Sequence, residues 1–508
     1  MNIKQAKEEI ANALRAYLAR DEFGNYRIPS IRQRPILLIG PPGIGKTQIM
    51  AQIAAESGVG LVSYTITHHT RQSAMGLPFI EKRVYDGAEV SVTEYTMSEI
   101  LASVHELMKR TGIREGILFL DEINCVSETL APMMLQFLQC KTFGNQRLPE
   151  GWLIVAAGNP PEYNRSVREF DVVTLDRVRK IDVREDFGVW KEYATRKGLH
   201  GAVISYLDIR KENFYSVETT VDGIQFATAR GWEDLSELLS VSEKIGGNVG
   251  RDTIEQYIQL PRIARDFANY LELYNKYRKS YRVEEVLQGQ WQPVTASELR
   301  AAPFDEKLSV MGLLLSRLTD CAKDVWRQDA LTVALHAALT EFREKLPDAE
   351  PLAILEQLLW KRREKLRQAR EAGHLDAETR DAAQREIGVL EEIQSLIREG
   401  AFPDRDAVMD AVRERFAEEV TRREASADDT GRRFDNAFRF LEEAVGETQE
   451  LVLFVTEITA AFYPSWYVET FGCEAYFRHN RELLFDDRKR QLQDKVLRAV
   501  RSGPDSAS

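Results

Sequence analysis

One segment constrains this chain more than any other, a glycine-rich loop between an apolar run and a helical pattern. The apolar run reads ILLIG, and the pattern TQIMAQIAAES after the loop is typical of a helix. The loop fits the spacing G-x-x-x-x-G-K-[ST], whose required context is a strand before it and a helix after it. Its residues are Gly40, Pro41, Pro42, Gly43, Ile44, Gly45, Lys46 and Thr47.

This spacing has a physical reason. Glycines let the backbone curl so that its N–H groups point inward at the oxygens of a phosphate. The helix that follows presents its positive N-terminal end to the same anion. Lys46 would place an ammonium on the β and γ phosphates, and the hydroxyl of Thr47 would reach Mg²⁺. We therefore expect residues 40–48, including Gln48, to bind the phosphates of ATP.

Two acids end a later apolar run, ILFLDE, and Asp121 follows Lys46 by 75 residues. A strand-terminal carboxylate beside a phosphate loop can hold Mg²⁺, and this is the role expected of Asp121. The adjacent Glu122 can orient and polarise an attacking water. Thr47 and Asp121 are therefore the expected magnesium residues, and Glu122 is the expected catalytic acid.

Another apolar run, IVAAGNP, ends in Asn159. An amide there can hydrogen-bond both the γ-phosphate and the attacking water, although an Asn before Pro160 is also common in turns. Arginines follow in LDRVR and in ATARGWEDL. A guanidinium can stabilise the charge that spreads over the γ-phosphate oxygens, but chemistry alone does not choose among the many arginines of this chain.

The order of these motifs resembles that of the MoxR-like group of AAA+ ATPases. GPPGIGKT, LFLDEIN, AAGNP, LDR and an arginine that opens a helix occur in that order, over roughly residues 30–275. GLPF and the two hairpin patterns also look like the insertions of the clade that holds magnesium chelatase and dynein motors. The resemblance implies Lys46 and Thr47 as the Walker A pair, Asp121 and Glu122 as the Walker B pair, Asn159 as sensor 1, Arg177 as arginine finger with Arg179 as the alternative, and Arg230 as sensor 2.

The resemblance also implies a function. Such proteins assemble as rings, commonly hexamers, and use Mg-ATP to remodel or chaperone a partner protein, often one with a von Willebrand factor A domain. Three alternatives stay open: a nucleic-acid-directed AAA+ motor, a slow nucleotide switch that recruits partners, and metal insertion by analogy with magnesium chelatase. Stimulation by nucleic acid, single-turnover rates and the identity of co-purified proteins would separate them.

Composition narrows the cellular context. The formal net charge is −12, which argues against a protein that grips nucleic acid along its surface. No apolar run reaches the ~18 residues that cross a bilayer, and the charged N-terminus does not match a signal peptide. We therefore expect a cytoplasmic protein without membrane insertion. The four cysteines are scattered, which favours free thiols over a disulfide framework or a zinc site.

Strands that alternate with helices in the first part of the chain predict an α/β fold, a parallel P-loop sheet of the AAA+ type. We expect hairpin inserts between Thr70 and Ser98 and at KTFGNQRLPEGW, and only helices after about residue 190. The predicted domains are an N-terminal helix and link (1–30), the nucleotide-binding core (31–195), a small helical lid (196–280), a mostly α-helical C-terminal region of open role (281–500) and a disordered tail (501–508).

Four further features have ordinary explanations that we favour. The charged pattern EQLLWKRREKLRQAREAG is expected to be a solvated surface helix. The aromatic stretch with Phe462, Tyr463, Trp466, Tyr467 and Phe471 is expected to form the core of a helical unit. His68-His69 lacks further ligands at metal-binding spacing. Cys125 is expected to pack in the interior and not to act as a nucleophile.

Overall fold

The structure is a computed structural model that describes residues 1–68, 74, 76–85, 88–143, 146–163, 167, 170–220, 223–371 and 377–481. The chain divides into two compact units. The first holds Met1–Val189, Thr228–Arg230 and Leu359–Gln384, and the second holds Trp190–Ala227, Gly231–Leu358 and Arg385–Ser508. Four predicted features lie outside the described residues: the side chain of His68, all of His69, residues 144–145 of the hairpin expected at KTFGNQRLPEGW, and the tail at 501–508. The five-domain division stays a prediction.

A parallel sheet forms the centre of the first unit, and its strand order is β2-β5-β8-β1-β9. Every pairing between these strands is parallel. The strands are β1 (Ile36–Ile39), β2 (Gly60–Thr65), β5 (Gly116–Asp121), β8 (Trp152–Gly158) and β9 (Arg179–Asp182). The predicted α/β class is confirmed. In such a sheet the carboxyl ends of the strands lie at one edge, which is where ligands bind.

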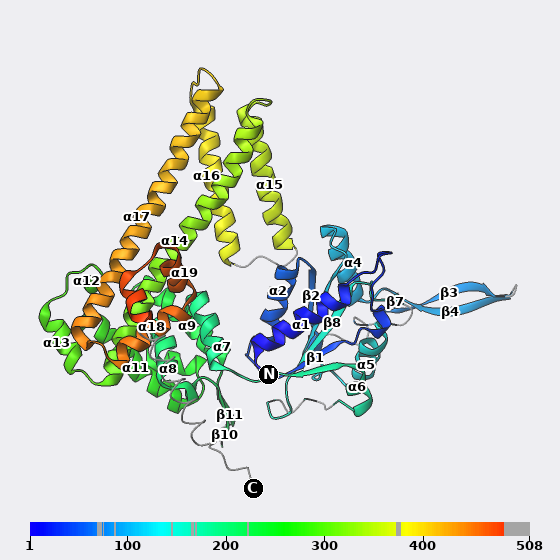
Figure 1. The fold of residues 1–508 in the computed structure, drawn as a ribbon. Helices are drawn as coiled ribbons and strands as arrows, with labels where there is room; N and C mark the ends of the chain where they lie inside the picture. Colours follow the sequence, from blue (N-terminus) through cyan, green and yellow to red (C-terminus); the bar gives the residue numbers. More distant parts are fainter. Residues whose placement is uncertain are drawn as a thin grey trace, which may run out of the picture. The chain divides into compact units, whose positions relative to one another are not determined.

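Helices cover both faces of this sheet (Figure 1). Helices α1 (Ile3–Leu18) and α2 (Lys46–Ser57) share one buried apolar cluster with Phe119 of β5. Helices α4 (Glu99–Thr111) and α5 (Ala131–Cys140) share another with the adjacent Leu118. Successive side chains of a strand point to opposite faces, so β5 contributes to both layers.

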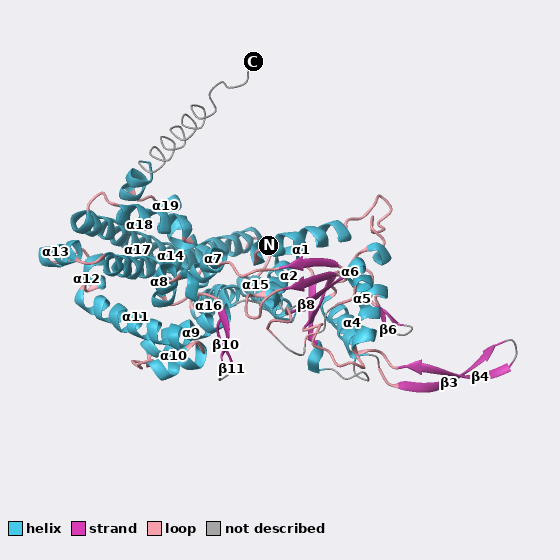
Figure 2. Cartoon of the chain, turned by 90° about the horizontal axis from the view of Figure 1, so that it is seen from below, coloured by secondary structure: helices cyan, strands magenta, loops and turns pink. Residues whose placement is uncertain are grey.

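Two antiparallel hairpins branch from this core. The first pairs β3 (Pro78–Tyr85) with β4 (Ala88–Tyr95), and it extends away from the sheet as a two-stranded ribbon (Figures 1 and 2). The second pairs β6 (Thr142–Phe143) with β7 (Gln146–Arg147). The amide of Gln146 joins them, because it donates to the Tyr95 carbonyl (3.2 Å) and accepts from the Ser98 N–H (3.0 Å).

The second unit is mostly helical and is called the helical unit below. One prediction for it was wrong. Strands do not stop near residue 190, because β10 (Ser216–Thr220) and β11 (Gly223–Ala227) form a third antiparallel hairpin. The segment SVETT is rich in β-branched residues, which fit a pleated strand. The helices that follow α6 (Val172–Arg177) are α7 (Phe187–Lys197), α8 (Gly201–Ile209), α9 (Ala229–Lys244), α10 (Arg251–Tyr257), α11 (Pro261–Ser280), α12 (Val283–Leu287), α13 (Pro293–Ala301), α14 (Phe304–Lys345), α15 (Pro351–Glu371), α16 (Ala377–Glu399), α17 (Arg405–Val445), α18 (Gln449–Ala460) and α19 (Phe462–Phe471).

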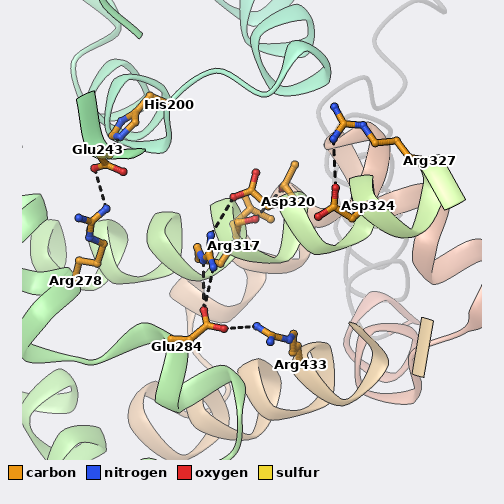
Figure 3. Close-up of polar contacts among 11 residues, drawn as sticks. His200, Glu243, Arg278, Glu284, Arg317, Asp320, Asp324, Arg327 and Arg433 are labelled. Atoms are coloured by element: carbon orange, nitrogen blue, oxygen red, sulfur yellow. Dashed lines mark hydrogen bonds and ion pairs between the residues drawn. The ribbon is translucent and has the colours of Figure 1, made fainter. Parts of the chain in front are cut away.

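The long helix α14 packs against α8, α11, α17, α18 and α19. Ion pairs reinforce this packing (Figure 3): Glu284 of α12 contacts Arg317 of α14 at 3.2 Å and Arg433 of α17 at 2.6 Å. Tyr463 and Tyr467 are buried, and the Tyr467 hydroxyl donates to the Ala427 carbonyl at 2.6 Å. The interpretation of the aromatic stretch as core is confirmed for these two residues. Trp466 and Phe471 are half-buried, and Phe462 is 41% exposed, which contradicts the core interpretation at that position.

Among the described residues, no single helix has the length and apolar character to cross a membrane. Helices α18 and α19, which meet at a bend of 89°, meet that criterion only when taken together.

Candidate functional site

The glycine-rich loop lies between the end of β1 and the start of α2, as the spacing predicts. Gly45 is the residue before α2, and its φ of 91° lies in the left-handed region that disfavours side chains. The N–H of Ile49 donates to the Gly45 carbonyl at 3.1 Å and so begins the helix. The loop therefore ends at the N-terminus of α2, where the helix dipole favours an anion.

Lys46 is buried, with only 8% of its surface exposed. Its ammonium donates to the carbonyls of Gly40 (2.7 Å) and Pro41 (2.8 Å) and to Oδ1 of Asn159 (2.9 Å). Burial lowers the pKa of Lys46 to about 8; the Asp121 carboxylate opposes this shift and the Arg230 guanidinium adds to it. The ammonium is thus held by three oxygens at the carboxyl end of β1.

The two strand-terminal acids lie beside this loop. The Thr47 hydroxyl donates to Oδ2 of Asp121 at 2.8 Å. Glu122 has a φ of 56°, a left-handed conformation that is uncommon for a side-chain-bearing residue. The hydroxyl of Thr67, just after β2, donates to Oε2 of Glu122 at 2.8 Å. Asp121 and Glu122 therefore face different partners, which suits two separate tasks.

Asn159 follows β8 and brings its side chain to Lys46. A second amide, Asn124, holds the main chain of Asn159. Its Nδ2 donates to the Asn159 carbonyl at 2.7 Å, and its Oδ1 accepts from the Asn159 N–H at 3.3 Å. The sequence analysis did not select Asn124, although its place in LFLDEIN, as a polar residue soon after the acids, was a usable signal.

Arg230 stands in the first turn of α9, and Thr228–Arg230 belong to the same compact unit as the loop. A Cβ built on Gly43 would lie 3.3 Å from the Cβ of Arg230 and 3.4 Å from that of Thr228. The backbone around Arg230 therefore packs directly on the glycine-rich loop, and its charge reaches Lys46.

The two remaining arginines differ in setting. Arg179 lies on edge strand β9 and forms an ion pair with Glu9 of α1. Arg177 is exposed at the end of α6 and donates to Gln139 of α5. Arg179 is thus engaged with α1, while Arg177 lies at the surface beside a neutral amide.

The structure brings together most of the predicted residues. Contacts join Lys46, Thr47, Asp121 and Asn159, and Arg230 packs on their loop. Gln48 is exposed on the first turn of α2, and Arg177 makes its recorded contact away from this cluster, at α5. The sequence analysis missed three residues that hydrogen-bond to predicted site residues: Thr67, Asn124 and Gln139. The other predicted residues of the glycine-rich loop are Pro41, Pro42, Ile44 and Gly45.

Thr47 and Asp121 together offer a hydroxyl and carboxylate oxygens, the hard donors that Mg²⁺ prefers. No group of three or more His, Cys, Asp or Glu side chains suited to a metal occurs within the described ranges. Two protein donors leave the other ligand positions of a magnesium ion to water and phosphate oxygens. Burial and the carboxylates of Glu122 and Asp121 raise the pKa of the Cys125 thiol, which disfavours the reactive thiolate and suits packing over nucleophilic chemistry.

Comparisons with known proteins agree with this geometry. A family model, "ATPase family associated with various cellular activities (AAA)", matches residues 36–174. The chain is 32% identical over 106 residues to the ATP-dependent protease ATPase subunit HslU of Sinorhizobium fredii, covering 20% of this chain and 24% of HslU. It is 27% identical over 165 residues to HslU of Pseudothermotoga lettingae, 32% of each chain.

A third relative is the ATPase family gene 2 protein homolog B of Bos taurus, 33% identical over 93 residues, which are 18% of this chain and 10% of the relative. Among solved structures, NtrX from Brucella abortus in complex with ADP aligns with 16% identity and a TM-score of 0.24, over 40% of this chain and 43% of NtrX. That score is too low to add to the assignment. The chain spans only a quarter to a third of the HslU sequences that it matches. The matched region is an ATPase domain of the AAA+ superfamily.

Proposed function

We propose that this chain binds Mg-ATP, hydrolyses it and, as a ring of the MoxR-like type, remodels or chaperones a partner protein. The observation that carries the proposal is the meeting of Lys46, Thr47, Asp121 and Asn159 at the carboxyl edge of the sheet, with Glu122 in the adjoining turn. An AAA+ domain in this region supports the same chemistry.

Each side chain then has one task. The loop amides and the N-terminus of α2 bind the phosphates, and the Lys46 ammonium neutralises charge on them. Thr47 and Asp121 would hold Mg²⁺, which supplies further charge neutralisation at the phosphate oxygens. Glu122 accepts a proton from the attacking water, and Asn159 orients that water or the γ-phosphate. Arg230 stabilises charge on the phosphates from its place over Gly43.

The arrangement of Arg177 supports a ring. Its guanidinium lies at the surface end of α6, and Val172 and Val173 of the same helix are 81% and 56% exposed. Exposed apolar side chains beside an arginine suit burial against another subunit. In this proposal Arg177 reaches the nucleotide of the neighbouring copy and acts as its arginine finger.

The β3–β4 hairpin supports a protein partner. Its side chains of Phe79, Ile80, Val84 and Val90 are 46%, 76%, 70% and 44% exposed. An isolated two-stranded hairpin is only marginally stable in water, so a covering surface would stabilise it. We propose that a partner protein, such as one with a von Willebrand factor A domain, supplies that surface.

Charges within the hairpin favour a protein over a nucleic acid. Lys82 pairs with Glu89 at 2.9 Å, and Arg83 pairs with Glu81 at 2.9 Å and with Glu94 at 2.8 Å. Since these basic side chains are neutralised inside the hairpin, they offer little to a phosphate backbone.

Glu122→Gln tests the hydrolytic site. The amide keeps the shape of the side chain but cannot accept the proton, so we expect ATP binding to persist while kcat falls by about 10²–10⁴-fold. Binding would be measured with a fluorescent ATP analogue and turnover by phosphate release. Glu106→Gln, an exposed acid on α4, is the matched control and should hydrolyse normally. Unchanged hydrolysis in Glu122→Gln would refute the site.

A further inference from the structure

We infer that Asn124 is a positioning residue that sets the place of Asn159 and couples it to the turn that carries Glu122. This inference rests on the proposed function, since it concerns how that site is held together. The Asn124 side chain bonds to the main chain of Asn159, whose own side chain accepts from Lys46.

The contact is a two-point clamp. One side-chain amide meets one residue's N–H and C=O, with the donor at 2.7 Å and the acceptor at 3.3 Å. Such a pair fixes both the position and the rotation of the Asn159 main chain, because two bonds of opposite polarity must be satisfied together. The Asn159 side chain starts from this fixed backbone, and its Oδ1 accepts from the Lys46 ammonium at 2.9 Å.

The clamp continues the sheet beyond its last ladder pair. Strands β5 and β8 are in register up to Leu120 and Ala156. The chain then turns through Glu122, and the N–H of Ile123 donates to the Ala157 carbonyl at 2.9 Å. Beyond this point the Asn124 side chain, in place of main-chain groups, supplies the hydrogen bonds to the segment after β8. The chain that leaves the Glu122 turn is therefore tied to β8 by Ile123 and, one residue later, to Asn159 just after β8 by Asn124.

Burial makes the position of Asn124 specific. It is 4% exposed, and a Cβ built on Gly158 would lie 2.5 Å from its Oδ1. Gly158 thus leaves the space in which the amide sits, and a larger side chain at either position would displace the clamp. A buried amide that loses its partners is costly, so the two bonds also favour one orientation of the Asn124 side chain.

A purely structural role is the competing explanation. If Asn124 only satisfies a buried loop, removing it lowers stability, and any kinetic loss is independent of the Asn159 side chain. If it positions Asn159, removing it matters only while the Asn159 side chain is present. A double-mutant cycle separates these cases.

The experiment compares Asn124→Ala, Asn159→Ala and the double variant in steady-state ATP hydrolysis by the full chain. We expect Asn124→Ala to lower kcat by at least about tenfold, since small displacements of catalytic groups are expensive, with the KM for ATP nearly unchanged. The double variant should be no slower than Asn159→Ala alone. An equal fold-loss in both backgrounds, or no loss of kcat, would overturn the inference.

Two variants guard against a folding artefact. Asn124→Asp keeps the side-chain shape but turns an oxygen toward the Asn159 carbonyl, so it should also lower kcat, and retention of wild-type kcat would contradict the clamp. Asn436→Ala removes a comparable amide bond, from Nδ2 to the Leu287 carbonyl at 2.8 Å, away from the site. This control should leave hydrolysis unchanged. Normal turnover by Glu122→Gln would instead refute the proposed function, which is a separate outcome.

Discussion

At the scale of single residues, Lys46 is the group whose charge state matters most for the proposed chemistry. Its ammonium is buried and its pKa is lowered to about 8. A bound triphosphate would favour the charged form and raise that pKa again. Binding therefore requires the uptake of a proton once the pH exceeds about 8.

This linkage predicts that ATP binding weakens as the pH rises through 8. The dissociation constant should increase by up to about tenfold per pH unit above that value, measured with a fluorescent ATP analogue between pH 7 and 9.5. Lys46→Met should bind weakly without this slope. Lys141→Met is the matched control. Burial also lowers the pKa of Lys141 to about 8, but this residue follows α5 and is not part of the glycine-rich loop, so the variant should keep the pH dependence of ATP binding. A flat profile in the unaltered protein would contradict the linkage.

Residue contacts could be predicted where a contiguous motif fixes them. The loop spacing puts Lys46 and Thr47 at a helix start, and strand-terminal positions bring Asp121 and Asn159 to the same edge. The place of Asn124 in LFLDEIN marked it as a polar residue near the acids, but neither its role nor that of Thr67 could be predicted, since both depend on contacts between segments distant in the chain. The functional roles of all these residues stay predictions.

At the scale of elements, the β3–β4 hairpin has the clearest consequence. We expect the double variant Ile80→Ser/Val84→Ser to bind an unfolded protein probe, fluorescein-labelled casein, at least about tenfold more weakly, because each lost apolar contact costs ~1 kcal/mol. Fluorescence anisotropy measures the binding. Basal ATP hydrolysis should not change. Thr93→Ser, which faces Ile80 across the hairpin, is the control. Equal casein affinity would argue against a partner surface here.

The helical unit makes a prediction of acid sensitivity. The hydrogen bond from His200, with further help from Arg278, lowers the pKa of Glu243 from 4.5 to about 2. A carboxyl whose pKa falls on folding stabilises the native state above its unfolded pKa, and that stability is lost as the pH drops from about 4.5 to 2. The difference in Tm between the unaltered protein and the Glu243→Gln variant should therefore decrease as the pH is lowered from about 4.5 to 2. Glu255→Gln removes an acid that pairs with a single arginine, Arg251, and should show a smaller gap. A constant gap would exclude the linkage.

Elements were predictable where periodicity was strong. The buried runs of β1, β5 and β8 and the helix after the loop were all indicated by apolar patterns. The β10–β11 hairpin was missed because its strands are short, lie between helices and alternate only weakly. Edge strand β9, only four residues long, likewise gave no distinct signal.

At the scale of the whole molecule, the central prediction is that neighbouring copies complete each other's sites. Arg177→Ala should lower kcat by about 10³-fold or more without loss of nucleotide affinity. Lys46→Ala should bind nucleotide too weakly for turnover but leave Arg177 intact. Mixing the two inactive proteins should restore hydrolysis, because a Lys46→Ala subunit supplies the missing guanidinium to its neighbour.

Arg179→Ala is the control for this mixing experiment. Arg179 is engaged by Glu9 of the same chain, so its loss should leave most hydrolysis in place. Failure of the mixture to recover activity, or full hydrolysis by a strictly monomeric species, would refute the ring. The sequence analysis could propose assembly only from resemblance, since nothing in one chain's periodicity specifies how copies meet.

The single amide of Gln146 has a mechanical implication. Because it holds both the Tyr95 carbonyl and the Ser98 N–H, the roots of the two inserted hairpins are fastened to each other. Tension applied to the outer ribbon would be transmitted through β7 and β6 toward the C-terminal turn of α5, where Gln139 meets Arg177. A load on the β3–β4 ribbon would in this way shift the Arg177 guanidinium that contacts Gln139.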